Sequence, residues 1–435
     1  MRVSTGVRGL DSLIEGGIPK GSTAMIAGNP GTGKTILCSH FIYDGLTTKD
    51  ENGVYISFSE SKTQFYANAE RLGMDFNKFE RQNKFAFLDF ASLTKDGVRD
   101  TLEEIYATIS STNAKRVALD SFSAISLAFE DMSEARTMVQ VLLGKMMRSE
   151  GITTMLVVEV PIGRNNIGSG IEESVADSIV QLEHTEDNAS PIVLRVIKMR
   201  CTIINREPHV CKIGNNGMIL FPKQSIKFPY RAAEGQTTSG IHGLDERIDN
   251  GLIRGTTTGI VGATGTAKST LSFQFIAEGI RKNESGIYCT LEQSLDEIRL
   301  MGKGYGYNMT ELESNGLSIF VSSADNENPD EFIANLAAEI KRTKAKRLVI
   351  DSLSVFAHRY KNEMYTIAKR ILSLIQEYQI TAIVTILTTQ TSGLNITEWD
   401  LSSLLQNIII LRFVEVQGRM KRILLILKTR GSGHD

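Results

Sequence analysis

This chain has no large excess of either charge, no closely spaced cysteine pairs and no long apolar runs. Its 435 residues carry 48 Lys and Arg against 50 Asp and Glu, a net charge of −2, which argues against nucleic acid or an anionic membrane as partner. The four cysteines, Cys38, Cys201, Cys211 and Cys289, lack metal-ligand spacing. We interpret them as reduced thiols of a cytoplasmic protein. The chain begins without an apolar signal region and has no run of about 18 apolar residues, so we expect no membrane span.

What the chain does contain is a duplication. The segment 5–11, Thr-Gly-Val-Arg-Gly-Leu-Asp, returns at 239–245 as Ser-Gly-Ile-His-Gly-Leu-Asp. A later segment, Arg-Val-Ala-Leu-Asp-Ser at 116–121, returns as Arg-Leu-Val-Ile-Asp-Ser at 347–352. Matching landmarks in the same order indicate two tandem copies of one domain, each too long to be a solenoid repeat.

The first copy is organised around a phosphate-binding loop. Its residues are Gly28, Asn29, Pro30, Gly31, Thr32, Gly33, Lys34 and Thr35. An apolar run typical of a buried strand precedes them, and a helical pattern follows. In this context glycines let backbone N–H groups turn toward phosphate oxygens at a helix N-terminus. We expect Lys34 to reach the β- and γ-phosphates of ATP, and Thr35 to ligate Mg²⁺.

The second copy has its own loop with one departure. Its residues are Gly262, Ala263, Thr264, Gly265, Thr266, Ala267, Lys268 and Ser269. Ala267 replaces the last loop glycine, where a methyl group crowds the backbone that wraps the phosphate. Lys268 and Ser269 remain, so we expect this loop to bind nucleotide, more weakly or with slower hydrolysis.

The apolar pattern predicts an α/β fold in each copy, with a mainly parallel, doubly wound sheet and nucleotide at the carboxyl ends of the strands. In the first copy we expect strands near 23–27, 54–58, 85–88, 116–120, 154–160, 178–182, 192–198 and 209–213, the last few antiparallel. We expect helices near 35–46, 62–72, 97–110, 133–150 and 171–176. The predicted domains are 1–225 and 237–435, joined by a linker at 226–236. The second copy ends without a counterpart of the last strand of the first, either naturally or by truncation.

Four carboxylates suit roles beside the loops. Asp120 and Asp351 end buried strands, where a second Mg²⁺ ligand is expected. A strand-terminal cap is the alternative for each. Glu60 and Glu292 follow the strand after each loop helix, where a carboxylate orients or deprotonates an attacking water or hydroxyl. They stand one position out of register, and a solvated loop acid is the competing interpretation.

Paired cations recur on late strands of both copies. Lys198 and Arg200 in the first copy match Lys428 and Arg430 in the second. Alternate positions place both cations of a pair on one face of a strand. Such pairs often keep an edge strand soluble, but their recurrence favours contact with the nucleotide of a neighbouring subunit.

Taken together, these motifs resemble the KaiC family of two-domain RecA-like ATPases. The resemblance covers nearly the whole chain. It rests on the repeated segment at 5–11 and 239–245, the loop Gly-Ala-Thr-Gly-Thr, the segment 350–354 and the ending Lys-Thr-Arg-Gly-Ser-Gly-His-Asp at 428–435. It implies a homo-hexameric double ring with ATP at the subunit interfaces. It also implies slow hydrolysis, mainly in the first domain, and Ser/Thr autophosphorylation in the second, in a signalling role with partner proteins.

Some family positions differ here. The family's paired glutamates survive singly, with Ser59 before Glu60 and Gln293 after Glu292. Ser402 and Ser403 match the family's two adjacent phosphoacceptors, beside an altered Trp399. A helix cap is the alternative role for these serines. The family's C-terminal tail, which contacts the clock regulator, is absent, so we infer no timekeeping.

Two other functions stay open. A recombinase or helicase of this fold needs cationic loops facing a ring channel, and the candidate segment 163–173 has one cation against two acids. A nucleotide-dependent assembly scaffold with little catalysis needs only the two phosphate loops. Phosphate release separates the scaffold from the enzyme, and salt-sensitive binding to single-stranded DNA identifies the motor.

Overall fold

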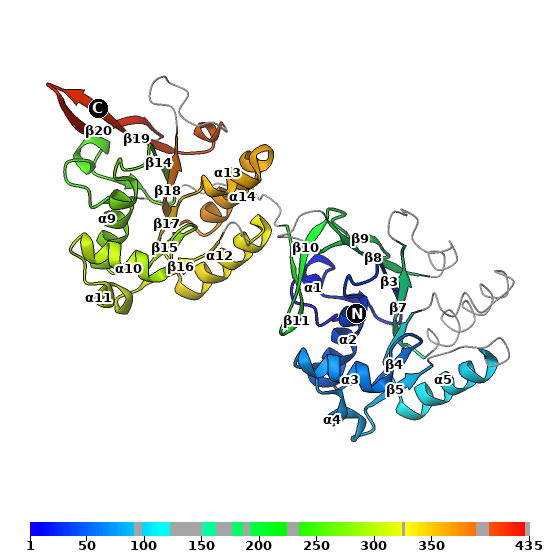
Figure 1. Cartoon of the computed structure of the whole chain (residues 1–435). Coiled ribbons are helices and arrows are strands. Elements are labelled where there is room, and N and C mark those ends of the chain that lie inside the picture. The colour runs from blue at the N-terminus through cyan, green and yellow to red at the C-terminus, as the bar shows by residue number, and fades with distance from the viewer. Residues whose placement is uncertain are drawn as a thin grey trace. The chain divides into compact units, whose positions relative to one another are not determined.

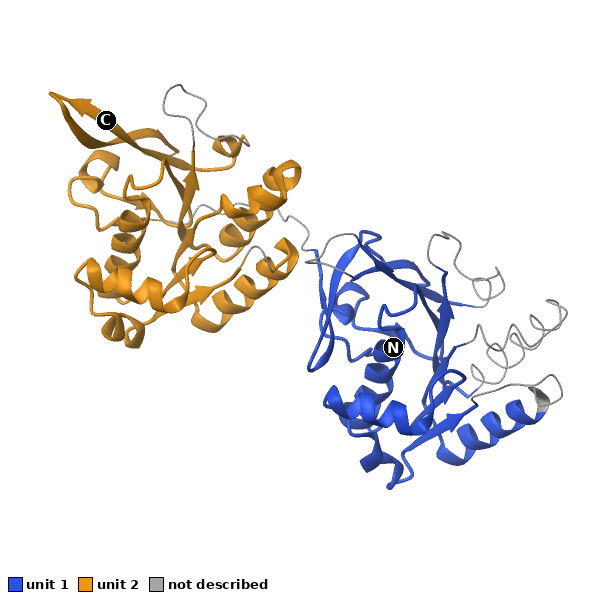
Figure 2. Cartoon of the chain, viewed as in Figure 1, with its two compact units in different colours: residues 1–223 blue, residues 224–435 orange. Residues whose placement is uncertain are grey.

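The structure of the chain is a computed structural model (Figure 1). It describes residues 1–90, 98–121, 150–161, 176–185, 192–223, 235–323, 327–388 and 400–430. The predicted helices at 133–150 and 171–176, the segment 163–173, Trp399 and residues 226–234 of the predicted linker lie almost wholly outside these ranges. The chain divides into two compact units, Met1–Lys223 and Gln224–Asp435 (Figure 2).

The first unit is built on a mixed, mainly parallel sheet. Its strands, in sheet order, are β11 (Gly217–Phe221), β10 (His209–Gly214), β9 (Ile192–Met199), β8 (Ser178–His184), β3 (Thr23–Gly28), β7 (Thr153–Glu159), β6 (Arg116–Asp120), β4 (Gly53–Ser57) and β5 (Phe85–Asp89). Strands β8 through β5 pair in parallel, whereas β8–β9, β9–β10 and β10–β11 are antiparallel. The predicted antiparallel ending is therefore confirmed.

Helices cover both faces of this sheet (Figure 1). They are α1 (Leu10–Leu13), α2 (Lys34–Asp44), a π-helical continuation (Gly45–Lys49), α3 (Lys62–Arg71), α4 (Phe76–Glu80) and α5 (Val98–Thr112). Helices α2, α3 and α4 lie on one face of the sheet and share one apolar cluster. Helix α5 lies on the other face and packs on a second cluster. A short sheet of β1 (Arg2–Val3) and β2 (Ile18–Pro19) precedes the loop. The sequence analysis missed α4, and its predicted helix 35–46 ends two residues beyond α2, inside the π-helical continuation.

The second unit repeats this plan with a shorter sheet. Its strands, in sheet order, are β16 (Leu317–Val321), β15 (Gly286–Thr290), β17 (Arg347–Asp351), β18 (Thr381–Leu387), β14 (Thr257–Gly262), β19 (Asn407–Val416) and β20 (Arg419–Thr429). All pair in parallel except β19–β20. Within the described residues no strand follows β20, so β10 and β11 have no counterpart here.

Its helices also form two layers. Helices α9 (Lys268–Arg281), α10 (Leu295–Gly304) and α11 (Met309–Ser314) lie on one face of the sheet, and α12 (Pro329–Thr343), α13 (Val355–Arg359) and α14 (Met364–Glu377) on the other (Figure 1). The remaining elements are the short sheet β12 (Gln236–Thr237) and β13 (Leu252–Ile253), and the 3₁₀ turns Asp245–Ile248, Lys361–Glu363 and Leu401–Ser403.

In each unit a buried arginine at the start of one strand, β6 or β17, links three separate segments by hydrogen bonds. Arg116 Nε donates to Glu51 at 2.7 Å, and Arg347 Nε donates to Glu284 at 2.6 Å. Each guanidinium also donates to a carbonyl of the loop helix and to one near the start of its unit; these acceptors are Phe41 and Ser4, and Phe275 and Thr238. A buried charge needs such partners, because an unpaired one is costly. The duplication therefore extends to individual contacts.

Candidate functional site

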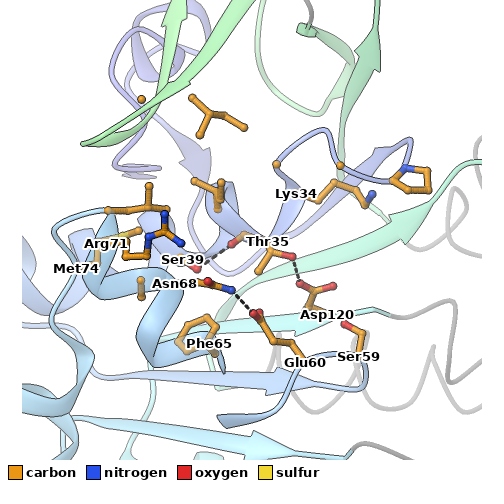
Figure 3. Close-up of a pocket in the computed structure, with 18 of the residues that line it drawn as sticks. Lys34, Thr35, Ser39, Ser59, Glu60, Phe65, Asn68, Arg71, Met74 and Asp120 are labelled. Atoms are coloured by element: carbon orange, nitrogen blue, oxygen red, sulfur yellow. Dashed lines mark hydrogen bonds between the residues drawn. The ribbon is translucent and has the colours of Figure 1, made fainter. Parts of the chain in front are cut away.

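The phosphate loop of the first unit opens onto a cavity of about 630 Å³ (Figure 3). It is lined by the loop, by α2 and α3, by the segment after β4, by the ends of β6 and β7, and by the β10–β11 hairpin. The lining residues are Pro30, Gly31, Gly33, Lys34, Thr35, Ile36, Ser39, Ser59, Glu60, Phe65, Asn68, Ala69, Arg71, Leu72, Met74, Asp120, Glu159, Ile213, Gly214 and Asn215. The sequence prediction for the first loop and its two acids thus converges on one cavity.

The loop has the backbone form that phosphate binding requires. Gly31 and Gly33 have φ of +80° and +87°, which glycine adopts without steric cost. Helix α2 begins at Lys34 without a side-chain cap, which leaves its first N–H groups directed at the loop. Lys34 Nζ donates to the carbonyls of Gly28 and Asn29 at 3.0 and 2.8 Å, and burial lowers the pKa of its amine.

The two predicted metal ligands meet in this cavity. Thr35 Oγ1 donates to Asp120 Oδ2 at 2.6 Å (Figure 3). The buried Tyr55 hydroxyl donates to the same oxygen at 2.8 Å, and burial raises the pKa of this phenol well above its usual value. Sequence reasoning missed Tyr55, although Tyr288 at the matching place in the second unit was an available signal.

Glu60 follows β4, which lies beyond β6 and its Asp120 when the strands are counted from the loop strand β3. Its carboxylate accepts a hydrogen bond from Asn68 Nδ2 at 2.6 Å, and its own N–H donates to Ser57 Oγ at 2.9 Å. Burial raises the pKa of the Glu60 carboxyl, against the opposing bond from Asn68. A half-buried carboxylate with a raised pKa is suited to accepting a proton.

The second loop keeps the conformation of the first. Lys268 Nζ donates to the carbonyls of Gly262 and Ala263 at 2.8 and 2.9 Å. Ala267 has φ of +82°, close to the +87° of Gly33, in a region that costs a non-glycine residue energy. The methyl group at Ala267 has therefore not changed the path of the loop.

The aspartate beside this loop keeps the tyrosine partner of its counterpart and differs in the second partner. Tyr288 donates to Asp351 Oδ2 at 2.7 Å, as Tyr55 does to Asp120. Asp351 Oδ1 accepts from Thr385 Oγ1 of β18 at 2.6 Å. The predicted ligands Ser269 and Asp351 both lie at the carboxyl edge of this sheet.

The two predicted proton acceptors are one position out of register. The N–H of Gln293 donates to Thr290 Oγ1 at 3.1 Å, as that of Glu60 does to Ser57. Gln293 is therefore the counterpart of Glu60, and Glu292 the counterpart of Ser59. The Glu292 side chain is exposed.

The paired cations contact their own unit. Lys198 Nζ donates to the Ala176 carbonyl at 2.8 Å, and Lys428 Nζ to the carbonyls of Ser402 and Leu405, both at 2.8 Å. The arginines follow the strands rather than lying on them, because β9 ends at Met199 and β20 at Thr429. Arg200 pairs with Asp177 at 3.1 Å, and Arg430 donates to the Ser403 carbonyl at 3.4 Å.

Ser402 and Ser403 lie in the short 3₁₀ turn before β19. Ser403 is exposed and Ser402 is half-buried. The Ser403 hydroxyl donates to the Asp400 carbonyl at 3.0 Å. Lys428 and Arg430 of the same chain hold the backbone of this turn, so a phosphate on either serine would form next to two cations.

Loop, helix, strand-terminal aspartate and parallel sheet, all present twice, define a tandem P-loop ATPase with RecA-like units. The family model for the KaiC ATPase matches residues 3–225 and again 237–435. The chain belongs to the KaiC family and is an ATP-binding enzyme of the ATPase class.

The similar proteins are clock proteins by name. A circadian clock oscillator protein KaiC from Rippkaea orientalis is 29% identical over the whole of this chain and 85% of its own length. One from Prochlorococcus marinus is 28% identical over the whole chain and 89% of its length. A KaiC 1 from Synechocystis is 28% identical over the whole chain and 86% of its length.

Among the described residues, no helix has both the length and the apolar character needed to cross a membrane. Over the same ranges, no three His, Cys, Asp or Glu side chains cluster as a metal site. The cysteines Cys38, Cys201, Cys211 and Cys289 are free thiols.

Proposed function

We propose that this chain binds Mg²⁺-ATP in both units and hydrolyses it mainly in the first. The observation that carries this proposal is the Thr35–Asp120 pair, 2.6 Å apart, with Lys34 and Glu60 in the same cavity. Hydroxyl and carboxylate oxygens are the hard donors that Mg²⁺ prefers, so these residues fit the ion. Bound there, Mg²⁺ would neutralise charge on the phosphates. In the second unit, Ser269 and Asp351 are the corresponding donors.

The residues of the first unit divide the chemistry among them. Backbone N–H groups of the loop and the start of α2 bind the phosphates, and Lys34 stabilises the charge that develops on the transferring phosphoryl group. Glu60, held by Asn68, accepts a proton from the attacking water. The second unit has Gln293 at the position of Glu60, which supports slower hydrolysis there.

Phosphate release from ATP tests this function. With Mg²⁺, the chain should release inorganic phosphate in many turnovers, and chelation of Mg²⁺ should stop it. The double variant Lys34→Ala/Lys268→Ala should lack activity, because both phosphate-stabilising charges are gone. A wild-type chain that binds ATP but releases no phosphate would leave the assembly scaffold as the remaining interpretation.

We also propose that ATP assembles the chain into a ring, a homo-hexamer by analogy with the family. Lys198 and Arg200, and Lys428 and Arg430, lie outside the phosphate loops, which is the arrangement of cations that complete a neighbour's site in trans. Mass photometry with saturating Mg²⁺-ATP should detect hexamers. Monomers alone under these conditions would rule out the ring.

A second activity, slow autophosphorylation of Ser402 or Ser403, is proposed for the second unit. The exposed Ser403 and the cations beside its turn support it. Glu292 is the candidate acceptor for the hydroxyl proton. Mass spectrometry after incubation with Mg²⁺-ATP should find phosphate on this turn, and less of it in Glu292→Gln. Equal phosphate in both proteins would remove Glu292 from this role.

These activities suit a cytoplasmic signalling protein whose partners are other proteins. A near-neutral charge of −2 favours that role over a DNA motor. Salt-sensitive binding to single-stranded DNA would reverse this preference.

A further inference from the structure

A third carboxylate, Glu159, borders the cavity of the first unit. It is the last residue of β7, the strand between β3 and β6 in the sheet. In the register of β3 with β7, Glu159 lies opposite Gly28, the first residue of the phosphate loop. Because parallel strands end at one edge, Glu159 lies between the loop and Asp120, and its side chain lines the cavity with both.

Two hydrogen bonds fix the backbone around Glu159 to the phosphate loop. The N–H of Val160 donates to the Gly28 carbonyl at 3.0 Å. The side-chain amide of Asn29 donates to the Val160 carbonyl at 3.1 Å. Glu159 is thus held against the loop by bonds on the residue that follows it, which is the preorganisation expected of a catalytic group.

The charge of Glu159 reaches the lysine that serves the phosphates. Burial lowers the pKa of the Lys34 amine, and Glu159 is the strongest of the neighbouring charges that oppose this effect, ahead of Asp120. A carboxylate this close to Lys34 also repels the phosphates that Lys34 attracts. Its charge therefore opposes nucleotide binding in the ground state, but it accelerates hydrolysis if its interaction with the attacking water is stronger in the transition state.

The second unit shows that the fold does not need this carboxylate. Leu387 ends β18 opposite Gly262, in the place of Glu159. Ala263 stands where Asn29 does, so the side-chain bond to the following strand cannot form. The strand still joins the loop, through the N–H of Thr388 and the Gly262 carbonyl at 3.4 Å. The second unit, for which slower hydrolysis is proposed, therefore lacks both the carboxylate of Glu159 and the side-chain amide of Asn29.

We propose that Glu159 is a second catalytic carboxylate of the first unit, one that orients the attacking water toward the γ-phosphate. This inference rests on the proposed ATP hydrolysis. The water oxygen bonds to the γ-phosphorus while the bond from phosphorus to the bridging oxygen breaks, and its electron pair leaves on ADP. Glu60 takes the proton of the water, and Glu159 accepts a hydrogen bond from its other O–H. Asn29 acts as a positioning residue that holds Glu159 in place.

The test is Glu159→Gln in a Lys268→Ala background, in which the first unit supplies the turnover. The isosteric amide removes the charge and keeps the shape, so kcat should fall roughly 10- to 100-fold, less than for a group that takes the proton itself, because Glu159 only orients the water. The dissociation constant of a non-hydrolysable ATP analogue should stay level or decrease, because repulsion is relieved. Asn29→Ala should lower kcat less. Glu150→Gln, an exposed carboxylate just before the amino end of β7, is the matched control and should match the background.

The outcomes separate this inference from the proposed function. If Lys34→Ala loses hydrolysis while Glu159→Gln keeps the background kcat, ATP hydrolysis stands and the role of Glu159 is wrong. If Glu159→Gln loses kcat and binds the analogue more weakly, Glu159 is structural and the proposal is overturned. A background protein that releases no phosphate overturns both.

Discussion

The two phosphate loops follow nearly the same path but face different surroundings. In the first unit, a Cβ on Gly33 would lie 2.7 Å from Ile213 Cδ1 and 2.9 Å from Met218 Cε of the β10–β11 hairpin. The described part of the second unit has no such hairpin, and Ala267 occupies the matching position at φ of +82°. Glycine is thus favoured at this position of the first unit by backbone conformation and by space, whereas in the second unit conformation alone favours it and Ala267 bears that cost. A loop motif must therefore be interpreted with what packs on it.

The largest expected difference between the units lies in their lysines. Lys34→Ala should reduce steady-state hydrolysis at least about 100-fold, since electrostatic stabilisation of this kind contributes several kcal/mol to the transition state. Lys268→Ala should reduce it less than about twofold if the first unit performs most turnovers. Phosphate release measures both, with nucleotide binding as the check on folding. Equal losses in the two variants would contradict the division of labour.

The next effect concerns Glu60. Glu60→Gln should leave nucleotide binding intact and lower kcat roughly 100-fold. Because burial raises the pKa of this carboxyl, its proton-accepting form is lost as pH falls through a value above the usual carboxyl range of about 4.3. The acid limb of the kcat profile should therefore lie above that range in the wild type and disappear in Glu60→Gln. A limb that persists unchanged in the variant would assign it to another group. Gln293→Leu in the second unit is the matched control.

Exchange of the loop residues gives a smaller effect on stability. Gly33→Ala should lower the free energy of unfolding of the first unit by about 1–3 kcal/mol, from the unfavourable φ and from crowding by the hairpin. Ala267→Gly should raise that of the second unit by about 1 kcal/mol, since it relieves the conformation alone. Urea unfolding with a probe in each unit measures the two. A Gly33→Ala effect no larger than the Ala267→Gly effect would show that the hairpin does not restrict the loop.

The last expected effect, similar in size, comes from the buried tyrosines. Tyr55→Phe and Tyr288→Phe each remove one hydrogen bond to an aspartate, at 2.8 and 2.7 Å, worth about 1–2 kcal/mol of stability. The Tyr55→Phe loss should appear in Mg²⁺-dependent activity, and the Tyr288→Phe loss in stability alone. Titration of hydrolysis with Mg²⁺ distinguishes the two variants. An identical Mg²⁺ dependence in both would contradict the role of Asp120 as the Mg²⁺ ligand for hydrolysis.

Local patterns predicted the fold well. Most first-unit strands begin and end within about a residue of their predicted bounds, because fully apolar runs with polar ends suit buried parallel strands. The positions of the loops, Asp120 and Glu60 could also be predicted, since the sequence itself shows the glycine spacing and the ends of the apolar strands.

What sequence reasoning missed depends on residues distant in the chain. Asn68 supports Glu60 from a helix, and Ile213 limits Gly33 from a hairpin about 180 residues away. Glu159 lies inside the predicted strand 154–160 without any motif around it, and only the order of the strands in the sheet places it beside the loop. Helix α4 is too short for its period to be recognised.

The most direct test of the division between units uses ATP labelled in the γ-phosphate, with free phosphate and protein-bound label followed together. We predict that Lys34→Ala abolishes most free phosphate and keeps the label on Ser402 or Ser403. Lys268→Ala should keep the free phosphate and lose the protein-bound label. Loss of both signals in the same variant, with neither lost in the other, would contradict the assignment of hydrolysis to the first unit and autophosphorylation to the second.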